Sequence, residues 1–594
     1  MDNLDIKNLK KTWRRLVKNT SNFKNLIVRD TLDFLDYKIE LEKNLKVLIF
    51  EINNTRYHPT KPYLLPFPKD KGISRPTVVF DAVDSLVFRF CIEQIEDDLI
   101  EEVRKVEVNK DFAVYGGFKI TPKKSQEVDD EEFYEKWLKD WKNLIKLISK
   151  ALESKVFLAK SDITAYFENI NLLILKDLVR STVKEKSHVV NLLFYFLENI
   201  IFRHEYSANS FIGIPQEDID CSRLLAFFLL NKLDIELKDF CTKNNISYYR
   251  WVDDINIIAD SEVLTKKALR VLSESLRKLG LTASLEKTQI LSKDDANKLF
   301  CFEENYFLDN FEKQMDAALK GEENLEDIKK QIEEYYELKK VQINKKPFAK
   351  ILKRFYKILA ILKSDILLDE LKLHLLEYQE VLASKKLYCY LCRNQNSSKF
   401  NSAIEDLINY LYSDENLYPQ LETNLIETLL YLDPKTITSN ISKKIAQLGE
   451  NIFFRTNNYN PLSEYSRALA LLLIFRFNQN ILNKIIKHYL NYEENDFVLK
   501  KYLIFVCLTT DNLNLCNKVI EKARREQNFS ISRLVSFIDN IDIYIDKKEV
   551  KDYINNNFIY IYKNEDNNEW IKEYYNPIRV EILKVLINRF KKTS

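Results

Sequence analysis

Glycine is scarce in this chain, and its scarcity limits the folds that the chain can adopt. The 594 residues include 7 glycines and 12 prolines, and a single glycine, Gly449, follows Gly321. Tight turns between strands depend on glycine and proline, so a protein built mainly of strands would need many more of them. Long helices need few. The composition therefore favours a largely helical protein and excludes an all-β fold.

Length and charge narrow the function classes. A chain of this length is too long for one hydrophobic core and should form at least two domains. Its 91 basic and 89 acidic residues give a net charge of +2, whereas a protein that coats nucleic acid is usually more basic. Any binding of nucleic acid must therefore use a local basic surface.

The N-terminal segment indicates the compartment. Residues 1–24 are charged throughout and lack the apolar region of a signal peptide. No apolar run is long enough to cross a bilayer, and the eight cysteines are scattered along the chain. We therefore expect a cytoplasmic protein that does not contact a membrane.

The first half of the chain mixes strand and helix patterns. The short apolar run at 156–159 predicts a buried strand, and residues 246–258 predict two strands around a tight turn. Residues 222–240 predict one long apolar helix. We expect an α+β domain over residues 1–310.

The character of the sequence changes beyond residue 310. The highly charged segment 322–345 predicts a solvated helical connector. Successive amphipathic helices follow it, in pairs that are typical of stacked helical repeats. We expect an all-α domain with HEAT-like helical repeats over residues 311–594.

Three aspartates stand at the ends of the predicted strands. Asp253 and Asp254 separate two apolar strand segments, although adjacent carboxylates repel and strands disfavour aspartate. An ordinary turn would explain this pair alone, but Asp162 directly follows a third predicted strand. Carboxylate oxygens are suitable ligands for two Mg²⁺ ions, which in such sites lie roughly 3.5–4 Å apart and assist phosphoryl transfer. The sequence predicts such a site at Asp162, Asp253 and Asp254, with Mn²⁺ as a substitute for Mg²⁺.

Further segments carry residues suited to a nucleotide. Lys69 and Arg75 flank a glycine in a basic loop, where arginine can grip phosphate with two hydrogen bonds and lysine acts as a point charge. Gln216 ends a Gly-Ile-Pro-Gln segment before a predicted helix, and Lys287 lies in a Lys-Thr pair after the second acidic segment. Each alone is also consistent with a solvated loop, a turn or a surface lysine.

The order of these segments is more informative than any one of them. A basic loop, a strand that ends at Asp162, a Gly-Ile-Pro-Gln segment, an aromatic-x-Asp-Asp hairpin and a Lys-Thr pair follow one another. In this order the chain resembles the reverse-transcriptase superfamily over residues 25–300. The resemblance implies a fingers and palm domain that adds deoxynucleotides by two-metal phosphoryl transfer.

The resemblance also implies catalytic roles. Asp162 matches the first catalytic aspartate, and Asp253 and Asp254 match the paired ones, so these three would hold the metal ions. Lys287 resembles the lysine thought to protonate the leaving pyrophosphate, a general-acid role.

Nucleotide-binding roles follow from the same resemblance. Lys69 and Arg75 resemble the fingers residues that grip the triphosphate, and Gln216 matches the glutamine near the nascent base pair. Phe167 resembles the aromatic gate that excludes a ribose 2′-hydroxyl, the group that distinguishes RNA from DNA. Tyr166, its neighbour, is a competing candidate for that gate.

Two departures point to a particular branch. Glu217 stands where most of these enzymes have a glycine, and its charge should weaken binding beside a template phosphate backbone. Trp251 replaces the usual tyrosine or phenylalanine. Together with the helical second half, they resemble the bacterial abortive-infection (Abi-type) reverse transcriptases of anti-phage defence. That family implies DNA synthesis without a template, priming by a protein tyrosine, and assembly into trimers or hexamers.

Two alternatives stay open. The same residues would serve a templated RNA-dependent DNA polymerase that copies a partner RNA held by the basic N-terminal helices. A scaffold protein with a relic palm would instead use the helical half as its working surface. Retention of all three aspartates together with Lys69, Arg75 and Lys287 argues against the scaffold.

Overall fold

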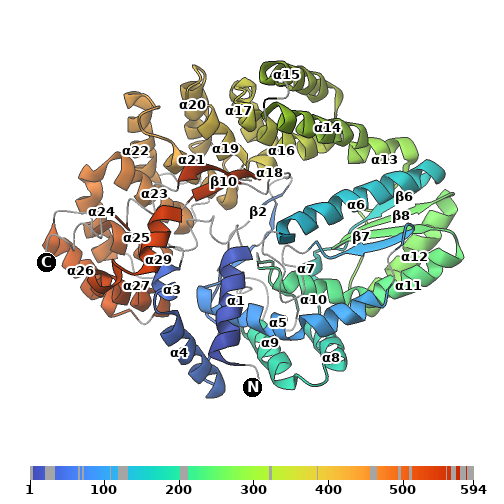
Figure 1. Cartoon of the computed structure of the whole chain (residues 1–594), viewed down its shortest axis with the longest axis horizontal. Coiled ribbons are helices and arrows are strands. Elements are labelled where there is room, and N and C mark those ends of the chain that lie inside the picture. Colours follow the sequence, from blue (N-terminus) through green and yellow to red (C-terminus); the bar gives the residue numbers. More distant parts are fainter. Residues whose placement is uncertain are drawn as a thin grey trace. The chain divides into compact units, whose positions relative to one another are not determined.

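The structure is a computed structural model of the whole chain, shown in Figure 1. It describes residues 4–19, 32, 34–64, 67–69, 73–75, 77–106, 109–117, 132–200, 212–217, 219–319, 321, 324–383, 386–454, 464–492, 497–507, 512–526, 528–556, 558–563, 570–575 and 583–584.

Contacts divide the chain into two compact units. The first contains Met1–Lys24, Leu41–Leu64 and Thr77–Phe302, and the second contains Asn25–Glu40, Leu65–Pro76 and Glu303–Ser594. Two short N-terminal segments that the sequence assigned to the first domain therefore belong to the second unit.

A five-stranded sheet forms the centre of the first unit. Its strands lie in the order β5 (Phe112–Tyr115), β7 (Ser247–Trp251), β8 (Asp254–Ala259), β6 (Phe157–Ser161) and β9 (Gln289–Ser292). Only the β5–β7 pair is parallel, and the other three pairs are antiparallel. The strands predicted at 156–159 and 246–258 are confirmed, and the mixed sheet with its helices gives the expected α+β class.

Helices cover both faces of this sheet (Figure 1). On one face, Leu144 and Ile148 of α6 (Glu132–Ser154) form a core with Leu158, Tyr249 and Ile258 of the strands. Helices α11 (Asn231–Lys243) and α12 (Glu262–Lys278) contact the sheet on its other face. The remaining elements of the unit are α1 (Ile6–Asn19), α4 (Leu41–Asn53), β1 (Tyr63–Leu64), β4 (Val78–Val79), α5 (Ala82–Arg104), α7 (Tyr166–Asn169), α8 (Leu172–Thr182), α9 (Ser187–Asn199), α10 (Cys221–Leu229) and α13 (Lys293–Phe300).

The single long helix predicted at 222–240 is wrong. The chain forms α10 and α11 instead, separated at Leu230, where ψ is −4°. Each helix buries its own apolar residues, and the Asn231 side chain at the start of α11 donates to the Glu102 carbonyl oxygen, 3.4 Å away. Tertiary contacts thus divide a segment whose local pattern is continuous.

The second unit is largely helical. Its hairpin consists of β2 (Phe67–Pro68) and β3 (Ser74–Arg75), and β10 (Phe558–Lys563) pairs with β11 (Trp570–Tyr575). Its helices are α3 (Leu35–Lys38), α14 (Phe302–Leu319), α15 (Leu325–Gln342), α16 (Lys345–Ile361), α17 (Leu371–Glu377), α18 (Gln379–Leu382), α19 (Lys386–Arg393), α20 (Phe400–Leu411), α21 (Pro419–Tyr431), α22 (Ser439–Phe453), α23 (Glu464–Phe477), α24 (Leu482–Tyr492), α25 (Phe497–Cys507), α26 (Leu513–Arg524), α27 (Phe529–Asp539), α28 (Ile541–Tyr544) and α29 (Lys548–Asn556), with short 3₁₀ turns at Ile366–Leu368 and Gln479–Ile481.

These helices stack in sequence order. Contacts join α16 to α19, α19 to α21, α21 to α23, α23 to α25 and α25 to α27, while α17, α20 and α22 form a second row. Contacts between near neighbours along the chain are typical of helical-repeat proteins. The HEAT-like identity of the repeats stays a prediction.

No single described helix is long and apolar enough to cross a membrane. The segments Tyr465–Phe477 and Gln479–His488 reach that threshold only when taken together, across a bend of 118°.

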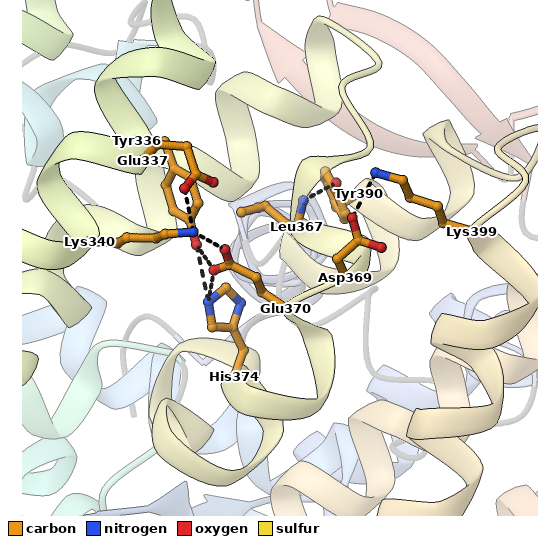
Figure 2. Close-up of polar contacts among 9 residues, drawn as sticks. All are labelled: Tyr336, Glu337, Lys340, Leu367, Asp369, Glu370, His374, Tyr390 and Lys399. Atoms are coloured by element: carbon orange, nitrogen blue, oxygen red, sulfur yellow. Dashed lines mark hydrogen bonds and ion pairs between the residues drawn. The ribbon is translucent and has the colours of Figure 1, made fainter.

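The charged segment at 322–345 is more than the solvated connector that its sequence predicted. Helix α15 buries Ile328, Ile332 and Tyr336. The Tyr336 hydroxyl and the Lys340 ammonium both donate to the Glu370 carboxylate (Figure 2). The apolar face of this helix is hard to recognise in the sequence, because charged residues outnumber the apolar residues in this segment.

Glu370 lies at the centre of a polar cluster in the second unit. His374 Nε2 lies 3.5 Å from a Glu370 carboxylate oxygen, and His374 Nδ1 lies 2.8 Å from the Tyr356 hydroxyl (Figure 2 shows all but Tyr356). Burial alone would raise the pKa of Glu370, but hydrogen bonds from His374, Lys340 and Tyr336 lower it to about 2. The cluster links α15, α16 and α17.

This lowered pKa predicts a pH dependence of stability. A carboxyl whose pKa is lowered on folding stabilises the folded state above its ordinary pKa of 4.5, and that contribution is lost as the pH falls through about 2. Glu370→Gln should therefore lower the melting temperature at neutral pH and flatten its decline between those pH values. Glu337→Gln is the matched control, because Glu337 pairs with the same Lys340 but is half exposed. Equal pH profiles for the wild type and Glu370→Gln would contradict the prediction.

Candidate active site

Strand register brings Asp162 and Asp254 to the same end of the sheet. In the antiparallel β6–β8 pair, Ser161 is opposite Ile255. Asp162 is the next residue after β6, and Asp254 is the first residue of β8, so the same register sets them opposite each other. Two of the predicted catalytic aspartates are thus neighbours across adjacent strands.

Asp253 occupies the turn between β7 and β8. Trp251 pairs with Asp254, so Val252 and Asp253 form a two-residue turn. Val252 has a φ of 54°, a value that a β-branched residue rarely adopts and that costs roughly 1–3 kcal/mol. Tight packing around the turn must hold this conformation.

Two lysines contact the aspartates. Lys287 Nζ donates to Asp162 Oδ2, and Lys160 Nζ lies 3.4 Å from Asp254 Oδ1. The β6–β9 pairing ends at Lys160 and Gln289, and beyond it the Ser284 amide donates to the Asp162 carbonyl oxygen at 2.7 Å. Lys287 lies in the turn between Ser284 and Thr288, and this turn brings its side chain to Asp162.

A buried ion pair supports the turn from inside the unit, and sequence reasoning missed it. Arg250 and Asp234 are both fully buried, and the Arg250 Nε–Asp234 Oδ1 distance is 2.8 Å. Arg250 Nη1 also donates to the Val252 carbonyl oxygen over 2.6 Å. Burial alone would lower the pKa of Arg250, but the charge of Asp234 raises it above its ordinary value. The guanidinium thereby fixes the peptide group between Val252 and Asp253.

A signal for this pair was present in the sequence. Arg250 stands in the apolar strand between Tyr249 and Trp251, and a charged residue buried in a strand needs a partner of opposite charge. The identity of the partner depends on how α11 packs against the sheet.

The aromatic pair after Asp162 is divided between core and surface. The Tyr166 hydroxyl donates to the Ala226 carbonyl oxygen, and the side chain is buried. Burial raises the pKa of Tyr166 well above its ordinary value, and the negative charge of Asp253 raises it further. Phe167 is only half buried. Phe167 is therefore the member of the pair with a ring partly open to solvent.

Gln216 lies in a loop that is anchored at both ends. Its carbonyl oxygen accepts a hydrogen bond from the Val78 amide at 2.7 Å, and the Ile214 amide donates to the Phe167 carbonyl oxygen at 2.8 Å. The loop therefore lies beside the segment that follows Asp162.

Glu217 caps a helix. Its carboxylate accepts hydrogen bonds from the amides of Ile219, at 2.5 Å, and Ser222, at 2.6 Å, at the start of α10. A carboxylate is favoured at a helix N-terminus, where unpaired amides and the helix dipole meet it. The expectation that this charge weakens template binding stays a prediction.

Trp251 occupies a space that a glycine provides. Its ring lies 5.0 Å from that of Trp141, in an edge-to-face arrangement. A Cβ atom on Gly117, which has a φ of +62°, would lie 3.0 Å from the Trp251 ring. The bulk that departs from the usual tyrosine or phenylalanine is thus accommodated by Gly117.

Lys69 and Arg75 belong to the second unit, so they do not join the aspartates within one unit. They lie on the β2–β3 hairpin, where Arg75 pairs with Phe67 and the Lys69 amide donates to the Ile73 carbonyl oxygen at 2.8 Å. Arg75 is exposed. The two residues therefore share one hairpin, and their triphosphate-binding role stays a prediction.

The aspartates suit Mg²⁺ in donor chemistry, since all of their ligand atoms are carboxylate oxygens. Among the residues that the structure describes, however, no group of three acidic, histidine or cysteine side chains is arranged to hold a metal ion. Asp162 and Asp254 instead form ion pairs with Lys287 and Lys160. The Lys287 side chain is 66% exposed.

Comparison with known proteins finds a family match that contains the acidic residues. Residues 135–314 match the family model for reverse transcriptase (RNA-dependent DNA polymerase). This range contains the three aspartates and Lys287, and it confirms the resemblance over these residues. A comparison with curated proteins found no match. The chain also aligns with the structure of apo telomerase from Candida tropicalis, with a TM-score of 0.30, 12% identity, and coverage of 80% of this chain and 69% of that one, a similarity too low to indicate a shared fold.

Proposed function

Residues 135–314 form a reverse-transcriptase domain and the chain is a nucleotidyltransferase; from this premise we propose that it is a DNA polymerase whose catalytic carboxylates are Asp162, Asp253 and Asp254. The observation that carries the proposal is the strand register, which sets Asp162 opposite Asp254 beside the turn that contains Asp253. Deoxynucleoside triphosphates are the proposed substrates.

Each residue has a proposed part in the reaction. The three aspartates would hold two Mg²⁺ ions, which when bound neutralise charge on the attacking and leaving oxygens. Lys287, next to Asp162, would give a proton to the departing pyrophosphate. The half-buried ring of Phe167 would exclude a ribose 2′-hydroxyl, with the Gln216 loop beside it.

We further propose that synthesis needs no template, starts from a protein tyrosine and serves anti-phage defence in the bacterial cytoplasm, in a trimer or hexamer. The support is the resemblance to abortive-infection reverse transcriptases together with the stacked helices of the second unit. Lys69 and Arg75 would grip the triphosphate from their hairpin.

Incubation of the purified protein with Mg²⁺ and single labelled deoxynucleotides, without a template, tests this proposal. We expect label to accumulate on the protein and to survive denaturation, and digestion followed by mass spectrometry should find it on a tyrosine. Incorporation that requires an added RNA and follows its sequence would reject untemplated synthesis. No incorporation with any template would reject the polymerase itself.

A templated enzyme that copies a partner RNA is the second candidate, and one helix favours it. Lys7, Lys11 and Arg14 are all exposed on α1, while Lys10 and Arg15 form ion pairs with Glu42 and Glu93. An exposed basic row suits RNA phosphates. Sequencing of the nucleic acid that co-purifies with the protein distinguishes the candidates, because a defined transcript and its complement are expected only from a templated enzyme.

A further inference from the structure

Helix α6 carries a row of lysines on its solvent side. Lys142, Lys146 and Lys150 are exposed and follow one another at intervals of four residues, so they lie on one face of the helix, about 6 Å apart along its axis. An open hollow of about 430 Å³ lies beside the row, and it is lined by Lys139, Asp140, Lys142, Asn143 and Lys146.

This row differs from the charged surface of α12. On α12, exposed cations meet acids, as in the ion pairs of Lys266 with Glu262 and of Arg270 with Glu274. Within the described residues, Lys142, Lys146 and Lys150 form no ion pair. Lys146 has the other two lysines four residues away on either side, and one acid, Glu153, follows Lys150 by three residues. Like charges four residues apart destabilise a helix, so the row is a surface that gains from an anionic partner.

The helix is oriented so that this row begins near the catalytic turn. Near the middle of α6, Trp141 packs against Trp251, which directly precedes the turn. Just beyond the C-terminal end of α6, Lys155 Nζ lies 2.6 Å from Ser247 Oγ, at the start of β7. Helix α6 therefore runs alongside β7, and the lysines lead away from the turn along the sheet.

The row also lies on the side of the sheet that carries a catalytic acid. Successive side chains alternate between the two faces of a strand. In β8, Asp254 therefore points to the same face as Ile258, and Ile258 packs against α6. A polymer that leaves the aspartates on this face would meet α6.

We propose that Lys142, Lys146 and Lys150 bind the backbone phosphates of one nucleic-acid strand, the strand that is being extended at the aspartates. A single row of lysines on one helix matches the single phosphate backbone of one strand. The partly exposed aromatic pair Trp141 and Trp251 lies between the lysine row and the turn, where bases can stack. The inference rests on the proposed polymerase function, but its test measures binding rather than synthesis.

The test is the salt dependence of binding of a labelled oligothymidylate to the full-length protein. Changing Lys142, Lys146 and Lys150 together to glutamine should weaken binding about 100-fold at 0.1 M salt and reduce the slope of log K against log salt by about 2, because each phosphate contact contributes about 0.7. The same three positions changed to arginine should keep the wild-type slope.

Controls separate this surface from general charge. Changing Lys266, Lys267 and Lys278 to glutamine removes the same charge from α12 and should leave binding unchanged. An equal loss from the α12 variant, or wild-type binding by the α6 variant, would overturn the proposal. Binding to anionic phosphatidylserine vesicles should be measured alongside binding to the oligothymidylate. If the α6 variant lost only its binding to vesicles, the proposal would also be overturned. If the wild type binds through α6 but never incorporates nucleotide, the proposed function fails while this surface stands.

Discussion

Asp254→Asn and Asp162→Asn are each expected to lower the rate of deoxynucleotide incorporation by at least about 1,000-fold, more than the 10–100-fold that loss of an outer partner costs at a metal site. Each change replaces an anionic oxygen ligand with a neutral amide at the same position. The shared strand register makes both residues part of one site, so neither should compensate for the other. Single-turnover incorporation measures the rate.

These variants should stay folded. The Asp254 side chain is 44% exposed, and its one ion pair is the surface contact with Lys160, so its loss costs little stability. Asp260→Asn is the matched control, because this exposed aspartate directly follows the other end of β8. Normal incorporation by Asp254→Asn would contradict the two-metal assignment. Intact phage protection by an inactive Asp254→Asn would favour the scaffold alternative.

The acidic site could be predicted from sequence because strands have a simple period. Asp162 and Asp253–Asp254 interrupt apolar segments that could only be buried strands, and antiparallel pairing of those strands brings their ends together. The contact of Lys287 with Asp162 depends instead on a turn between Ser284 and Thr288, where the strand register shifts. Strand pairing alone therefore accounts for the aspartates and not for Lys287.

Features that depend on tertiary packing could not be predicted in this way. The capping contact of Glu217 was missed, because it depends on where α10 begins. The break between α10 and α11 at Leu230 has no proline or glycine that would predict it from the sequence. The partner of Arg250 lies on a helix 16 residues earlier, and only the packing of α11 on the sheet brings Asp234 to it.

The Arg250–Asp234 pair gives the second large expected effect. Arg250→Met should lower the free energy of unfolding by about 3–5 kcal/mol, because it leaves the buried Asp234 charge without its partner. It should also reduce incorporation, because the Val252 carbonyl oxygen loses its donor and the strained turn is no longer held. Chemical denaturation and single-turnover incorporation measure the two effects.

A double variant separates stability from positioning. Asp234→Asn added to Arg250→Met removes the unpaired charge. The Tyr248 hydroxyl now donates a hydrogen bond to Asp234 Oδ1 at 2.9 Å, and it can still donate to the amide oxygen of the asparagine. Most of the lost stability should return, since a neutral buried pair carries no charge penalty. Incorporation should stay about 100-fold low, as expected when catalytic groups shift by about 1 Å.

Arg89→Lys, at another buried arginine far from the turn in sequence, should lower the stability of the protein but not the incorporation rate of the folded enzyme. Recovery of both stability and incorporation in the double variant would show that Arg250 acts only through folding, and that the turn holds Asp253 and Asp254 without it.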